Sequence, residues 1–204
     1  MVRRIVLLFA VMITALVAGA AGAVAQPSPS PTHSPTHSPT HSPSPSVSEQ
    51  DRTFLIEAHQ GNLAEIRAGR LAESKATTAS LRQLGTRLIK DHTKLDTKVR
   101  QVAKEVGVQL PREPTKQQQS SLKQVSGLSG TNFNRAWVHM QQIAHRQTLA
   151  AVNKELSSGS SEPVKRVAQQ AKPIIKEHLA LLKQQQASMS PRPRTSTPTA
   201  RPTH

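Results

Sequence analysis

The fold is decided by the stretch ASLRQLGTRLIKDHTKLDTKVRQVAKEV, residues 79–106. Its apolar residues recur at steps of three and four, the spacing that places side chains on one face of an α-helix. That face carries one histidine among aliphatic residues: Leu81, Leu84, Leu88, His92, Leu95, Val99, Val102 and Val106. Gly107 follows directly, and glycine is the residue at which helices commonly end. The pattern therefore predicts one long amphipathic helix that ends at Val106.

Three further long stretches show the same spacing, over residues 49–76, 131–159 and 161–186, and a short helix is predicted over 115–125. Ser48 is a suitable N-cap, and Pro163 stands in a first turn, where its missing N–H does no harm. Helices of this length are about 40 Å long, and short connections between them favour antiparallel neighbours. No run alternates between apolar and polar residues, so no sheet is expected. The sequence predicts an all-α fold, an antiparallel four-helix bundle.

Each predicted long helix carries one residue of metal-ligand type on its apolar face: Glu65, His92, His145 and His178. Counted from the connecting turns, Glu65 lies near the level of His92, and His145 near that of His178. Burying such groups without partners costs several kcal/mol. Convergence around a cation satisfies them, and imidazole with carboxylate suits iron, manganese, copper or zinc. We therefore predict a metal site with one ligand from each helix.

The alternative is a buried polar network in which the same four side chains bind one another without a metal. Asp91 and Glu177 directly precede two of the histidines and point about 100° away from them on their helices. We expect these two carboxylates to support the site from its rim rather than to bind an ion. His59 and His139 are predicted to be surface residues.

The beginning of the chain has the order of a secretory signal peptide. Arg3 and Arg4 precede an apolar run, which ends in small residues at Ala23-Val24-Ala25. We expect residues 1–25 to be removed by cleavage after Ala25. The alternative is an uncleaved membrane anchor, because the apolar run is long enough to cross a bilayer.

Two segments rich in Pro, Ser and Thr flank the helical region, at residues 26–47 and 188–204. The first contains three successive Thr-His-Ser-Pro units. Such composition offers nothing to bury and favours extended chain, so both segments are predicted to be disordered. The folded domain is accordingly expected over residues 48–187.

The composition excludes several classes of function. The chain has no cysteine, so disulfides, thiol catalysis and cysteine-ligated metals are absent. No serine-nucleophile motif, phosphate-binding glycine loop or HExxH motif occurs, and nothing defines a substrate, so catalysis is not predicted.

The charge of the helical region indicates a class of partner. Residues 49–186 contain 22 Lys plus Arg and 12 Asp plus Glu, a net charge of +10. An exported protein of this charge is attracted to anionic cell-envelope polymers or lipid headgroups. The alternative is a solvated basic surface without a partner. Nucleic acid is not an expected partner, because export argues against it and the region lacks an aromatic platform for stacking.

Six segments of the helical region together resemble one family of exported bacterial proteins, called domain of unknown function 4142. They are residues 54–66, 71–76, 88–94, 107–111, 133–137 and 171–179. The resemblance spans about residues 49–186 and implies a ferritin-like four-helix bundle of unestablished activity.

The chain departs from the family pattern at two positions, where Asn134 replaces a usual Asp and Arg67 replaces a common Glu. It also lacks the Glu-x-x-His pair on which ferritin-type di-iron centres depend. The resemblance therefore favours a mononuclear histidine-rich site, or a site without metal, over a di-iron centre.

Overall fold

The computed structural model describes residues 47–190, which contain five α-helices and no strand. The helices are α1 (Glu49–Lys75), α2 (Ala79–Glu105), α3 (Lys116–Ser126), α4 (Gly130–Ser158) and α5 (Glu162–Ser188). The predicted all-α fold is confirmed, and every predicted helix end lies within two residues of its place in the structure. The signal peptide predicted at 1–25, the linker as far as residue 46 and the tail from residue 191 lie outside the described residues.

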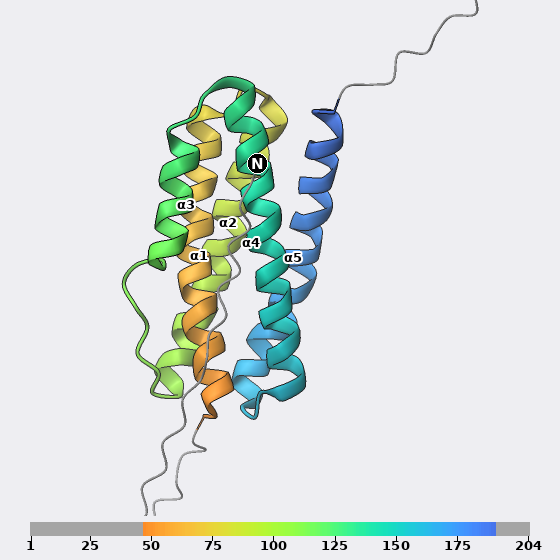
Figure 1. Cartoon of the computed structure of the whole chain (residues 1–204). Helices are drawn as coiled ribbons and strands as arrows, with labels where there is room; N and C mark the ends of the chain where they lie inside the picture. Colours follow the sequence, from red (N-terminus) through yellow and green to blue (C-terminus); the bar gives the residue numbers. More distant parts are fainter. Residues whose placement is uncertain (1–46, 191–204) are drawn as a thin grey trace, which may run out of the picture. The chain divides into compact units, whose positions relative to one another are not determined.

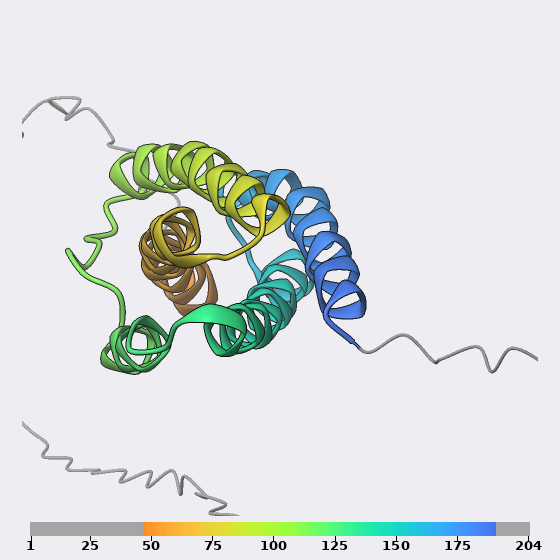
Figure 2. The same cartoon turned by 90° about the horizontal axis from the view of Figure 1, so that it is seen from above.

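The four long helices lie side by side, and the short α3 lies on the outside of them (Figure 1). Seen from above, α1 is surrounded by α2, α3 and α4, while α5 packs against α2 and α4 (Figure 2). Among the helices of residues 47–190, none is both long enough and apolar enough to cross a membrane.

The helix ends follow from local sequence. Ser48 and Asp51 form a capping box at the start of α1, in which each side chain binds the other residue's backbone N–H. Thr115 and Gln118 form the same arrangement at the start of α3. Gly107 follows α2 with a φ of 71°, a conformation that glycine adopts without strain. Such local rules explain why the helix boundaries are predictable from sequence.

Asp51 also joins α1 to the turn between α4 and α5. Its buried carboxylate accepts hydrogen bonds from the backbone N–H groups of Ser160 and Ser161, both at 3.0 Å, and from the hydroxyl group of Ser160. Burial alone would raise the pKa of Asp51, but these bonds and those from Ser48 lower it well below its usual range. The charged carboxylate thus fixes the turn that precedes α5 to the start of α1.

Glu155 is a second buried carboxyl group near this turn. Gln50 donates to one of its oxygens (3.2 Å), while the other has no hydrogen-bond partner among the described residues. Burial raises the pKa of Glu155 to about 7, and the charge of Asp51 acts in the same direction. The folded chain therefore holds a proton here that the unfolded chain releases near pH 4.5.

We expect this group to reduce the free energy of unfolding as the pH rises from about 4.5 to about 7. In that window the unfolded state loses the proton and the folded state keeps it. Glu155→Gln, which mimics the protonated form, should abolish this part of the pH dependence. Urea unfolding at pH 5 and pH 8 measures it. Glu105→Gln, at an exposed carboxylate, is the control, and the prediction fails if both variants keep the wild-type pH dependence.

Two apolar clusters fill the interior, one toward each end of the long helices. The first includes Phe54, Leu95, Val152 and Ile175, and the second includes Leu84, Leu88, Trp137, Val138 and Leu182. On α2, α4 and α5 a buried histidine stands in sequence between the residues of the two clusters. A layer of buried polar side chains therefore divides the core at about the middle of the long helices.

Helices α1 and α2 approach each other closely at Gly69 and Gly85. A Cβ atom built on Gly85 would lie 2.7 Å from the carbonyl oxygen of Gly69 and 2.8 Å from Cβ of Ala72. The reciprocal atom on Gly69 would lie 2.7 Å from the carbonyl oxygen of Gly85. Both positions thus favour glycine, because in each case a backbone carbonyl oxygen of the other helix lies in the way.

Candidate metal centre

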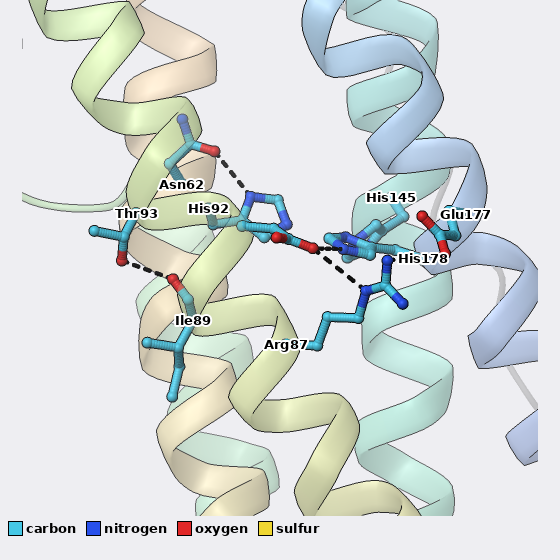
Figure 3. A network of polar contacts seen from close by, with 9 residues as sticks. Asn62, Arg87, Ile89, His92, Thr93, His145, Glu177 and His178 are labelled. Atoms are coloured by element: carbon cyan, nitrogen blue, oxygen red, sulfur yellow. Dashed lines mark hydrogen bonds and ion pairs between the residues drawn. The ribbon is translucent and has the colours of Figure 1, made fainter.

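The polar layer contains three histidines from three helices: His92 on α2, His145 on α4 and His178 on α5. Their side chains are almost completely buried, with 2%, 1% and 0% of their surface exposed. The ring centroids lie 5.3–5.5 Å apart, and each ring offers one nitrogen within 4.8 Å of the others. Figure 3 shows the three rings meeting between α2 and α5. The structure thus brings together three of the four ligands that the sequence pattern predicted.

Each ring is held from outside by a hydrogen-bond acceptor. Nδ1 of His92 donates to Oδ1 of Asn62 (2.8 Å), and Nδ1 of His145 donates to the carbonyl oxygen of Gln141 (2.9 Å). Nε2 of His178 donates to the carboxylate of Asp91 (3.0 Å). Because a neutral imidazole carries only one N–H, these three bonds assign the proton to the outer nitrogen of each ring.

The inner nitrogens consequently present lone pairs to one another. Nε2 of His145 and Nδ1 of His178 are 3.2 Å apart, and neither has a proton to donate in the neutral rings. Among the described residues, Nε2 of His92 has no hydrogen-bond partner although it is buried, and Figure 3 shows it on the side of the ring that faces the other two histidines. Three lone pairs that face a common space form an arrangement that a cation would satisfy.

The surroundings favour the neutral form of His92 and His178. Burial lowers the pKa of His92 well below its usual value, and the neighbouring His145 and His178 rings lower it further. Burial also lowers the pKa of His178, against the opposing effect of the Asp91 carboxylate. A neutral imidazole is the form that binds a metal ion.

Glu65, the fourth predicted ligand, lies outside the three-nitrogen cluster. One of its oxygens accepts a hydrogen bond from the side-chain amide of Gln141, and the other lies 3.6 Å from Nδ1 of His145, the outer nitrogen of that ring. Burial raises the pKa of Glu65, whereas His145 and Gln141 act to lower it. Its position is thus behind His145, on the side of the outer nitrogen.

The two carboxylates predicted at the rim have different surroundings. Asp91 binds the His178 ring, as described, and also lies 3.4 Å from Nε of Arg87. Glu177 instead forms an ion pair with Nη2 of Arg87 (2.8 Å), on the outer side of the site (Figure 3). Only Asp91 therefore contacts a ring of the cluster directly.

Comparison with known proteins gives the family. The model of the family described as Domain of unknown function (DUF4142) matches residues 36–184. The chain belongs to the DUF4142 family. A crystal structure of a DUF305 fragment from Deinococcus radiodurans is similar in fold, with a TM-score of 0.61 and 13% sequence identity. That match covers 71% of this chain and 98% of the fragment, and no curated protein matches the chain.

Sequence reasoning missed two members of the buried polar cluster of this chain, Asn62 and Gln141. Both were findable, since Asn62 precedes Glu65 by three residues and Gln141 precedes His145 by four, which places each pair on one helix face. The expectation that His59 is a surface residue is wrong. His59 is buried and binds the carboxylate of Asp96 (2.6 Å) and the carbonyl oxygen of Pro111 (2.9 Å). His139 is exposed, as expected.

Proposed function

We propose that this protein is an exported cell-envelope protein that binds one transition-metal ion through His92, His145 and His178. One observation carries the proposal: each ring donates from its outer nitrogen, so the three inner nitrogens are left with lone pairs. A metal ion would bind Nε2 of His92, a buried nitrogen that has no hydrogen-bond partner among the described residues.

The distances are compatible with a single ion. Two nitrogens at ~2.0–2.1 Å from one tetrahedral zinc ion are about 3.3 Å apart. The 3.2 Å between Nε2 of His145 and Nδ1 of His178 has that magnitude. The remaining separations, within 4.8 Å, require His92 to move toward the pair by roughly 1.5 Å.

The donor set favours particular metals. The cluster consists of imidazole nitrogens, whereas manganese and magnesium prefer oxygen ligands. Imidazole suits copper, zinc and iron, and affinity at a given site normally increases from iron to copper and then falls at zinc. We therefore expect copper(II) to bind more tightly than zinc. Such an ion would supply Lewis acidity or, for copper and iron, redox capacity.

The remaining parts of the proposal concern the fold and the location. We infer that α1, α2, α4 and α5 form an antiparallel, ferritin-like four-helix bundle. We further infer that residues 1–25 direct export and that Pro-rich segments flank the bundle on both sides. The net charge of +10 supports attraction to anionic envelope polymers or lipid headgroups. Cell fractionation tests this: the protein should begin at Gln26, sediment with the envelope and be released by salt. An intact N-terminus or salt-independent sedimentation contradicts it.

The metal proposal is tested by loading the purified protein with copper(II) or zinc and determining the bound metal after gel filtration. We expect one ion per chain, and loss of that ion in the His92→Ala/His178→Ala double variant. His139→Ala removes an exposed histidine and should still bind one ion, which controls for surface binding.

The competing function is a metal-free scaffold whose buried histidines bind only one another. It requires an additional proton between His145 and His178, since neither inner nitrogen carries one in the neutral rings. A folded protein that remains metal free after exposure to both ions would support the scaffold and contradict the metal site.

A further inference from the structure

A pocket of about 740 Å³ lies between α1, α3 and α4, and its wall continues onto residues of α2 and α5. Apolar side chains form most of this wall, among them Phe54, Ala64, Leu95, Val125, Met140 and Ile175. Small-molecule sites usually have volumes of about 300–1,000 Å³ and linings of this kind. The pocket therefore has the size and character of a ligand site.

The pocket has an apolar rim. Leu128 and Ile143 both line it, and they are 37% and 40% exposed, the two large hydrophobic residues among residues 47–190 that are left open to solvent. The adjoining α3 has only one buried residue, Val125, which also lines the pocket. Exposed apolar residues gathered at one opening are typical of a binding site.

Four buried polar side chains contribute to the same lining: Asn62, Glu65, His92 and Gln141. A few polar groups within an otherwise apolar pocket usually orient the ligand's own polar group. Four members of the polar layer of the core thus line this pocket.

The charge of the lining restricts the class of ligand. None of the described residues that line the pocket is Lys or Arg, although the helical region carries 22 such residues. Glu57 and Glu65 also line it, so a ligand anion would meet carboxyl groups and no cation. Glu57 is exposed, and the one buried carboxyl group that a ligand cation would meet, Glu65, already accepts a hydrogen bond from Gln141.

We propose that this pocket binds one uncharged, mainly aliphatic molecule whose single polar group lies against Glu65, His92 and Gln141. The apolar part of the ligand fills the space between α1, α3 and α4. This site lies beside the proposed metal centre and shares His92 with it.

Gly61 offers a way to block the pocket without disturbing the fold. It lines the pocket within α1, and a Cβ atom built on it meets no other atom within 4 Å. Gly61→Leu should therefore place a side chain in the ligand's space, whereas Gly61→Ala adds a single methyl group and is the matched control. Thermal unfolding of both variants checks that the fold is retained.

The experiment is calorimetric titration of the purified protein with 1-decanol, decanoate and decylammonium, which share one chain and differ in charge. We expect 1-decanol to bind one molecule per chain more tightly than either ion. Gly61→Leu should weaken its binding about tenfold or more, and Gly61→Ala by about twofold at most. Equal affinity of Gly61→Leu and wild type for 1-decanol would overturn the pocket, and tighter binding of either ion would overturn the uncharged class.

Discussion

Gly85→Ala is expected to destabilise the folded protein by about 1–3 kcal/mol, although alanine is the better helix former. The added Cβ would lie 2.7 Å from the Gly69 carbonyl oxygen and 2.8 Å from Cβ of Ala72, distances that force α1 and α2 apart. Separation of the two helices loosens both apolar clusters, since each contains residues of α1 and α2. Thermal unfolding should show a melting temperature lower by roughly 3–10 °C.

The matched control is Gly61→Ala in α1. Its new methyl group enters open space, so the helix propensity of alanine is gained without a steric cost. We expect this variant to be more stable than wild type by about 0.5–1 kcal/mol. Opposite signs for the two glycines support the close approach of α1 and α2. Stabilisation by Gly85→Ala would show that the helices do not depend on this contact.

The contrast between these glycines shows which part of the fold is predictable from the sequence. Helix ends depend on local chemistry, such as the capping box at Ser48 and the positive φ at Gly107, and they were predicted within two residues. The helix contact at Gly69 and Gly85 depends on two segments meeting in one register. A glycine in an amphipathic pattern does not indicate which residue of another helix it will contact, so the contact between these two glycines was not predicted.

The same distinction applies to the site. Periodicity placed His92, His145 and His178 on inward faces, because burial follows the helix period. It could not determine which side of a neighbouring ring a carboxylate occupies. Glu65 was predicted as a ligand, and the structure places it behind His145, next to the outer nitrogen. That difference depends on side-chain rotamers and on the exact height of α1, which spacing along a chain does not specify.

The hydrogen bond between Asp91 and His178 gives the second large expected effect. The Asp91 carboxylate holds the proton on Nε2 of His178 and so directs the lone pair of Nδ1 toward the other two rings. Partners of this kind typically change metal affinity by 10–100-fold. We therefore expect Asp91→Ala to weaken binding of zinc to the purified protein by about 10–100-fold. Competition with a chromophoric chelator at constant pH measures this change.

Glu177→Ala is the matched control for this measurement. Glu177 is the neighbouring carboxylate on the outer side of the site, and like Asp91 it pairs with Arg87, but it contacts none of the three rings. Removing it changes the local charge by the same amount, so a general electrostatic effect would lower zinc affinity equally in both variants. A tenfold or larger loss confined to Asp91→Ala would show that orientation of the His178 ring is the cause. Equal affinities in the two variants would mean that the outer hydrogen bonds do not determine which nitrogens face the ion. The positions of the ring protons would then give no support to a metal centre.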